Sequence, residues 1–228
     1  MKTLKIVTLI FLVLAAGQSL AQQQEAGIRF LVGAPTGDFG DAVDDLGFGI
    51  EAHYGLRPVP AWTFGVGLHA MAYGSETRTY RMPLVEDFDL NTTNNLAGGF
   101  LFAQFRPLSG PVQPYVEARG GINYLWTESK LEDQDWWDGD EVARKTNYDD
   151  FAPFWGGGGG LLIKLCRGDS AQEKPGVLLD LKVTYTQGAK AEYLTEGDVE
   201  IVNNVPVFSP SKTDTDLLSY ELGVVLTF

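Results

Sequence analysis

Eight segments of this chain show alternation or another strand-like composition, and this repeated period of two constrains the fold more than any other feature. In one of them, Phe48, Ile50 and Tyr54 fall on one parity, and Glu51 and His53 fall on the other. Successive side chains of a β-strand point to opposite faces, so such a segment predicts a strand with one apolar and one polar face. The segments are 27–34, 46–57, 62–73, 95–106, 112–127, 154–165, 176–187 and 216–228.

The connections between these segments alternate in length. The short ones carry proline or glycine and lie at 58–61, at 107–111 and around 166–175, whereas the long polar ones lie around 35–45, 74–94, 128–153 and 188–215. Short turns at one end and long loops at the other are typical of transmembrane barrels, with the short turns in the periplasm. The predicted fold is all-β, an eight-stranded antiparallel up-and-down barrel with both termini at the short-turn end.

The N-terminal residues 1–21 are predicted to be a secretory signal peptide. Lys2 and Lys5 precede an apolar run, and small residues lead up to Ala21. The run has roughly half of the ~20 residues that a spanning helix needs. Residues 22–228 then form one barrel domain. Loss of the two lysines reduces 17 basic residues to 15 against 30 acidic ones. The resulting net charge of −15 argues against nucleic acid as a partner.

Alternation alone fits either a soluble barrel with an apolar interior or a membrane barrel with an apolar exterior. The polar face carries full charges and many glycines, whereas the apolar face carries almost no charge. An eight-stranded lumen is only wide enough to be filled by side chains, so the large rings of the apolar face would not all fit inside. These rings also gather at strand ends, which predicts two interfacial girdles. The girdle residues are Tyr124, Trp126, Trp155 and Tyr185 near the long loops, and Trp62, Phe105 and Phe228 near the short turns.

Three stretches make the chain resemble the outer-membrane β-barrel superfamily, in particular the small eight-stranded barrels of outer membrane protein A and X type. They are "GAPTGDFGD" (33–41), "QPYVEARGGINY" (113–124) and "YELGVVLTF" (220–228). The resemblance covers the whole chain after the signal peptide. It implies that Phe228 is part of the signal read by the outer-membrane insertion machinery. The chain differs from two-domain members of the superfamily because it stops at the barrel.

Charges on the polar parity are predicted to form an ion-pair network in the lumen. A pore selective for one sign of charge should show a ring of that sign. The set here is balanced, with four acids and four bases, so paired charges that fill the interior are favoured over a conducting pore. The network is predicted to contain Arg29, Glu51, His69, Glu117, Arg119, Lys164, Asp180, Lys182 and Glu221.

The two histidines, His53 and His69, are both predicted to face the lumen. If the 58–61 turn pairs residues whose numbers sum to 120, His69 lies opposite Glu51. A histidine–carboxylate pair can act as a base and its orienting group. A lipid-modifying enzyme should present such a group near lipid or at the outer rim, so an interior structural role is favoured and catalysis is the least favoured reading.

Other conspicuous motifs favour structural interpretations. The stretch "LEDQDWWDGDE" (131–141) is rich in carboxylates but lacks the calcium-loop spacing, which favours an acidic solvated loop. "WGGGGG" (155–160) lacks the ending of a phosphate loop and suits tight barrel curvature. Cys166, the single cysteine, is predicted to be a free thiol at a turn. No cofactor, metal site or catalytic residue is predicted.

The predicted protein is an outer-membrane barrel of a Gram-negative bacterium, with extracellular long loops and periplasmic termini. Its predicted role is structural or surface interaction through the long acidic loops. A narrow channel for small solutes is the alternative. The expected partners are outer-membrane lipid and lipopolysaccharide and the insertion machinery, and the sequence identifies no extracellular partner.

Overall fold

The computed structural model describes residues 23–43, 45–80, 88–133, 141–166, 175–193, 199–202, 205–208 and 211–228. The predicted signal peptide and the centre of the acidic stretch 131–141 lie outside these ranges. No helix among the described residues is long and apolar enough to cross a membrane.

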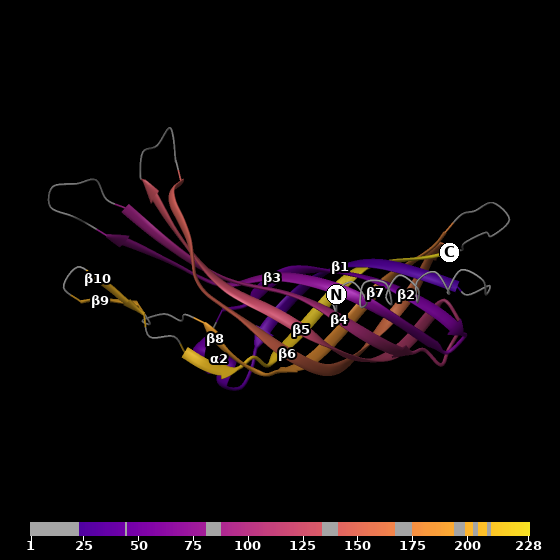
Figure 1. The fold of residues 1–228 in the computed structure, drawn as a ribbon. Coiled ribbons are helices and arrows are strands. Elements are labelled where there is room, and N and C mark those ends of the chain that lie inside the picture. Colours follow the sequence, from indigo (N-terminus) through magenta and orange to yellow (C-terminus); the bar gives the residue numbers. More distant parts are fainter. Residues whose placement is uncertain are drawn as a thin grey trace, which may run out of the picture.

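Eight long strands close into one antiparallel barrel, as predicted (Figure 1). Each strand pairs with its neighbours in sequence, and the last strand pairs with the first, with Ile28 opposite Val224. The barrel strands are β1 (Gln23–Pro35), β2 (Gly47–Val59), β3 (Trp62–Tyr80), β4 (Phe88–Phe105), β5 (Val112–Asp133), β6 (Glu141–Cys166), β7 (Gly176–Gly188) and β12 (Leu217–Thr227).

The remaining elements lie at the long-loop end of the barrel. The short helix α2 (Asp38–Ala42) follows β1. After β7, the strand β8 (Lys190–Tyr193) pairs with β11 (Ser211–Asp214), and β9 (Val199–Val202) pairs with β10 (Val205–Phe208). The connection between β7 and β12 is therefore two small hairpin-like pairs rather than an unstructured loop.

Two of the predicted long loops are mostly strand. The β3–β4 pairing continues to Tyr80 opposite Phe88, and the β5–β6 pairing continues to Glu132 opposite Glu141. Because β4 and β5 also stay paired, as far as Phe88 opposite Asp133, the four strands extend beyond the barrel as one sheet. The expectation of loops at 74–94 and 128–153 was wrong. Both segments are mostly polar and lack a clear apolar alternation, so their sequence did not mark them as strands.

The apolar face of the barrel points outward, as predicted. Leu68 is 69% exposed, and Leu181 and Val224 also lie on the outer surface. Glu51, at 1% exposure, and Lys182 are buried in the interior. An exterior of exposed apolar side chains around a charged interior is the arrangement that a bilayer requires and that water would disfavour.

The interior also contains large apolar side chains, which corrects the expectation of a lumen filled by ions. Phe100, Phe102 and Phe154 are buried together inside the barrel. Their rings fit because glycines of neighbouring strands make room: a Cβ added to Gly67 would lie 2.2 Å from Cζ of Phe100. In the same way, Gly160 of the glycine run leaves space for the ring of Tyr115.

Candidate functional site: the barrel interior and its outer girdles

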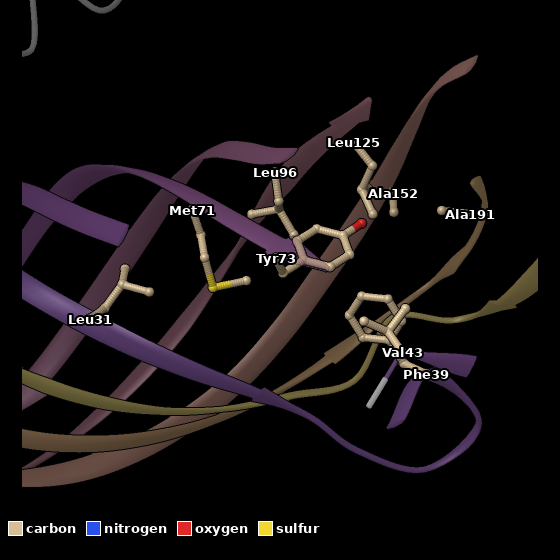
Figure 2. Close-up of a cluster of buried hydrophobic side chains, with 9 residues drawn as sticks. All are labelled: Leu31, Phe39, Val43, Met71, Tyr73, Leu96, Leu125, Ala152 and Ala191. Atoms are coloured by element: carbon tan, nitrogen blue, oxygen red, sulfur yellow. The ribbon is translucent and has the colours of Figure 1, made fainter. Parts of the chain in front are cut away.

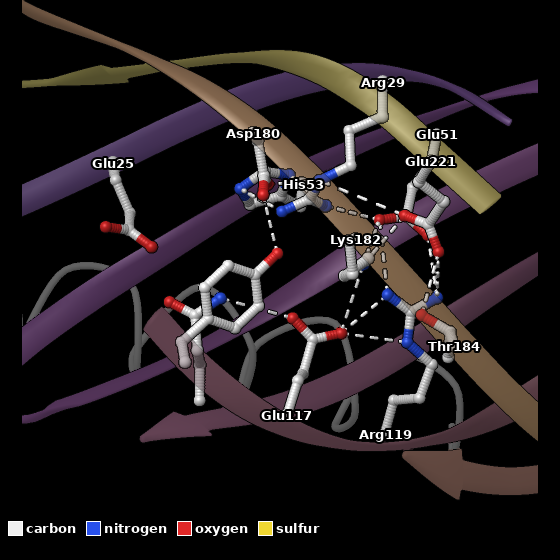
Figure 3. A network of polar contacts seen from close by, with 12 residues as sticks. Glu25, Arg29, Glu51, His53, Glu117, Arg119, Asp180, Lys182, Thr184 and Glu221 are labelled. Carbon is white, nitrogen blue, oxygen red and sulfur yellow. Dashed lines mark hydrogen bonds and ion pairs between the residues drawn. The ribbon is translucent and has the colours of Figure 1, made fainter. Parts of the chain in front are cut away.

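Seven charged side chains from five strands meet in the centre of the barrel, and we call them the interior ion cluster (Figure 3). All are predicted members of the lumen network, and all are buried. They are Arg29 of β1, Glu51 of β2, Glu117 and Arg119 of β5, Asp180 and Lys182 of β7, and Glu221 of β12.

Glu51 is the centre of this cluster. It accepts hydrogen bonds from Arg29 Nη1 at 2.5 Å, from Arg119 Nη1 at 2.8 Å and from Lys182 Nζ at 3.2 Å. The barrel brings these groups together because Arg29 lies directly opposite Glu51 in the β1–β2 register and the other two project inward from facing strands. Buried charges need partners of this kind, because an unpaired one costs several kcal/mol.

The other cluster members complete a connected network. Arg119 Nη2 donates to Glu117 at 2.6 Å, and Arg29 Nε donates to Asp180 at 2.7 Å. Asp180 also accepts a hydrogen bond of 2.7 Å from the hydroxyl of Tyr115, a partner that the sequence analysis did not identify. The network therefore joins strands on opposite sides of the lumen.

Lys164 does not belong to the cluster, although its parity predicted that it would. Its side chain is exposed near the end of β6, where the β6–β7 register shifts between Lys164 and Cys166. Without it, the cluster contains four carboxylates (Glu51, Glu117, Asp180, Glu221) and three bases (Arg29, Arg119, Lys182). The expected balance of four acids and four bases is therefore wrong by one base.

A second buried ion pair closes the short-turn end of the lumen. Nη2 of Arg106 donates to both carboxylate oxygens of Glu25, at 3.1 and 3.0 Å. The same nitrogen donates to Gln104, which in turn donates to Glu117 at 3.4 Å. Sequence reasoning missed Glu25, because Glu25 precedes the segment 27–34 in which alternation is visible.

The histidines are interior residues with polar partners. The register places His69 opposite Glu51, as predicted, but its Nε2 lies 2.9 Å from Oδ1 of Asn123. His53 lies beside the cluster, with Nδ1 2.9 Å from Nη1 of Arg29. Neither imidazole pairs with a carboxylate by hydrogen bonding within the described part of the chain, so the geometry shows no base with an orienting carboxylate.

An apolar plug fills the lumen between the ion cluster and the long loops (Figure 2). The ring of Phe39 on α2 is 0% exposed and packs edge-on against Tyr73, with ring centroids 5.4 Å apart. Below the plug, a cavity of about 30 Å³ reaches the ion cluster. That volume holds about two waters by the usual minimum of ~10–15 Å³ each. The plug is formed by Leu31, Phe39, Val43, Met71, Tyr73, Leu96, Leu125, Ala152 and Ala191.

The predicted girdle at the short-turn end has aromatic side chains on the outer surface. Trp62 stacks on Phe64 and also contacts Phe105, with ring centroids 5.8 and 5.0 Å apart. Phe228 is 58% exposed, and its backbone pairs with Gln24 through two hydrogen bonds. Figure 1 shows the C-terminus at the end of the barrel opposite the projecting parts of β3–β6.

The predicted girdle at the long-loop end also lies on the outer surface and carries polar anchors. Tyr124 stacks on Trp126 and packs against Phe151, which the sequence analysis did not include. Trp155 Nε1 donates to Gln187 at 3.1 Å, and the Tyr185 hydroxyl donates to Asp216 at 2.8 Å. Such amphipathic rings suit the interface between hydrocarbon and water.

The structure combines an even number of antiparallel strands, an outward apolar band, aromatic side chains at both ends and a polar interior. The barrel is of the outer-membrane type. Its remaining motifs fit this architecture without adding a site. Cys166 is an exposed free thiol at the end of β6. Among the described residues, no three histidine, cysteine or carboxylate side chains gather to hold a metal ion. The stretch 131–141, which the sequence analysis compared with calcium loops, lies largely outside the described residues.

Neither a protein-family model nor a curated protein matches the sequence. Several solved structures do. Neisserial surface protein A matches with 14% identity and a TM-score of 0.42, over 90% of this chain and 95% of that one. Ail, the attachment invasion locus protein of Yersinia pestis, matches with 11% identity and a TM-score of 0.42, over 92% and 100%. A major outer membrane protein from Thermus thermophilus matches with 15% identity and a TM-score of 0.40, over 89% and 99%.

Proposed function

We propose that this protein is a non-conducting outer-membrane barrel that carries an interaction surface outside the bilayer. The observation that carries the proposal is the continuation of β3, β4, β5 and β6 beyond the barrel as a four-stranded sheet. A barrel needs its strands only to the membrane surface. Strands that stay paired beyond it provide a rigid platform held by the barrel as its anchor.

One edge of this platform is open to a further strand. The β2–β3 pairing ends at Phe48 opposite Ala72, so within the described ranges Ser75–Tyr80 pairs only with β4. Unpaired N–H and C=O groups of an edge strand can pair with an extended segment of another chain. The stretch 131–141, whose residues 131–133 pair with β4, carries six acidic residues and no basic one. An extended, basic polypeptide segment is the partner that this combination fits.

A narrow solute channel remains the second candidate, and the interior argues against it. Both the ion cluster and the apolar plug lie across the lumen, and opening a path would separate buried ion pairs. Removing one partner of such a pair costs ~3–5 kcal/mol. In planar bilayers we expect no single-channel steps from the folded protein. Discrete conductance steps would favour the channel instead.

The orientation follows from this role. We place the four-stranded sheet and the long loops outside the cell, and the short turns and C-terminus in the periplasm. The bilayer partners are then outer-membrane lipid and lipopolysaccharide, and the insertion machinery reads Phe228. A lipid-modifying activity is disfavoured because His69 lies inside the wall, and unchanged lipid profiles in a His69→Ala strain would agree with that.

Two variants distinguish the contribution of the open strand edge from the contribution of the acidic residues to peptide binding. Deleting 75–92 removes the projecting part of β3 and β4, whereas replacing the carboxylates of 131–141 by amides keeps the chain length. An alternating lysine–valine peptide should bind the wild type in a salt-sensitive way, the deletion variant weakly, and the amide variant with less salt dependence. Equal binding by all three proteins, each shown to be folded by faster migration of the unboiled form, would contradict the proposal.

A further inference from the structure

The outer wall of the barrel contains a groove with a volume of about 670 Å³ over β3 and β4. Its floor consists of small residues, Ala70 on β3 and Ala97 and Gly99 on β4. They are contiguous because Ala70 pairs with Ala97, and Gly99 is the next outward-facing residue along β4. Taller side chains rise around this floor, namely Ile50, Leu68, Ile122, Tyr124 and Phe151.

The groove lies inside the band that faces hydrocarbon and ends at an aromatic girdle. Leu68, Ile122 and Phe151 are among the most exposed apolar side chains of the molecule. At the long-loop end, Tyr124 stacks on Trp126, whose Nε1 donates to Glu128 at 3.2 Å. From that polar rim, the floor runs along β4 towards the middle of the barrel wall.

We propose that this groove binds one acyl chain of a membrane lipid, with the lipid head group at the long-loop girdle. Its lining side chains are apolar apart from Tyr124, because the His69 ring is directed into the lumen, towards Asn123. A linear hydrocarbon chain fits a floor of small side chains beside the rings of Tyr124 and Phe151. The site is continuous with the surface by which the barrel contacts lipid, so an acyl chain reaches it from within the bilayer.

A second copy of the barrel is a poorer occupant. Leu68 and Phe151 project on either side of the floor of small residues, so a partner barrel would have to insert a matching ridge. An acyl chain enters without such a requirement. The floor residues can also be enlarged without disturbing the backbone, which makes the proposal testable.

Gly99 and Gly120 form a matched pair for this test. A Cβ added to Gly99 would lie 3.4 Å from Cδ2 of Leu68, and one added to Gly120 would lie 3.5 Å from the carbonyl oxygen of Phe154. Both distances are ordinary contacts, so a side chain is tolerated at either position. Gly99→Leu fills the floor of the groove, whereas Gly120→Leu enlarges the outer wall of β5 outside it. Ala70→Leu is a second filling variant, at an exposed position.

The wild type and the three variants are purified from membranes in a mild detergent, and retained lipid is counted by native mass spectrometry as the detergent concentration rises. We expect the wild type and Gly120→Leu to keep one lipid, and Gly99→Leu and Ala70→Leu to keep it about tenfold less. Faster migration of the unboiled protein verifies folding, and if Gly99→Leu fails to fold, Ala70→Leu decides the result. Equal retention by all folded proteins, or a wild type that holds no lipid, would overturn the proposal. So would a two-chain species that only the filling variants lose, because it would identify the groove as a self-association surface.

Discussion

Lys182 is the one cation of the interior ion cluster that lies within hydrogen-bond distance of Glu221. The guanidinium groups of Arg119 and Arg29 lie 3.7 and 3.9 Å from the Glu221 carboxylate, whereas Nζ of Lys182 is 2.8 Å from its Oε2. The other oxygen accepts from the Thr184 hydroxyl at 3.0 Å. Since the interior ion cluster contains one more carboxylate than bases, and Glu221 has one close cation where Glu51 has three, we expect the charge of Glu221 to be less costly to remove than that of Glu51.

Glu221→Gln should therefore leave the barrel almost as stable as the wild type. An amide keeps an oxygen for Thr184 and removes the surplus buried charge. We expect a change in the free energy of unfolding of less than ~1 kcal/mol, the net value of a typical hydrogen bond. Urea unfolding in detergent micelles measures it.

Glu51→Gln is the comparison, because Glu51 accepts hydrogen bonds from three cations. Neutralising it leaves Arg29, Arg119 and Lys182 with one fewer charged partner. We expect a loss of ~3–5 kcal/mol. Equal losses for the two variants would show that the surplus charge is not located at Glu221.

The Arg106–Glu25 pair predicts a strong coupling at the short-turn end of the lumen. Arg106→Met alone leaves the Glu25 carboxylate buried without its cation and should cost ~3–5 kcal/mol. Adding Glu25→Leu removes the stranded charge, so the double variant should be more stable than Arg106→Met. A double-mutant cycle from urea unfolding gives the coupling energy. Additive losses would mean that the two side chains do not depend on each other.

The contact between Gly67 and Phe100 predicts a rescue. Gly67→Ala places a methyl group where the Phe100 ring lies, because the added Cβ would be 2.2 Å from Cζ. Overpacking of this kind costs ~1–3 kcal/mol. In the Phe100→Leu background, where the ring is absent, adding Gly67→Ala should therefore cost less stability than it does in the wild type. Gly120→Ala, on the open outer surface, is the control and should be nearly neutral. Failure of the rescue would locate the clash elsewhere.

Alternation was sufficient to predict the barrel because the bilayer imposes opposite environments on the two faces of each spanning strand. Glu51 and Ile50 differ in type because Glu51 faces the lumen and Ile50 faces lipid. The register in which paired residue numbers sum to 120 correctly placed His69 opposite Glu51. The same signal is weak in the parts of β3 beyond Tyr73 and of β5 beyond Thr127, which are mostly polar on both parities. These parts were therefore predicted to be loops.

The contents of the lumen were harder to predict, because parity says which way a side chain points and not what it meets. Val225 lies on the polar parity of its strand, together with Glu221, yet it is buried with Tyr115, Leu162 and Leu178 inside the barrel. Met71 has the inward parity of His69 on β3, and Leu96 has that of Gln104 on β4, but both belong to the apolar plug. Lys164 had the correct parity but lies too close to the strand end to remain inside.

Substitution of the last residue, Phe228, distinguishes a role of its ring in folding from a role of its ring in assembly into the membrane. The backbone of Phe228 donates to the Gln24 carbonyl at 3.0 Å and accepts from the Gln24 amide at 2.9 Å, which closes the β1–β12 seam, whereas its ring points outward. Phe228→Ala keeps both hydrogen bonds and removes the ring. Refolding of the purified variant into detergent should therefore be close to that of the wild type. In cells, if the insertion machinery reads the ring, processed Phe228→Ala should accumulate in the periplasm. Cell fractionation, with the migration of unboiled samples as the measure of folding, compares the two. Normal assembly in cells would exclude the ring as a signal, and an equal defect in both settings would make its role one of stability.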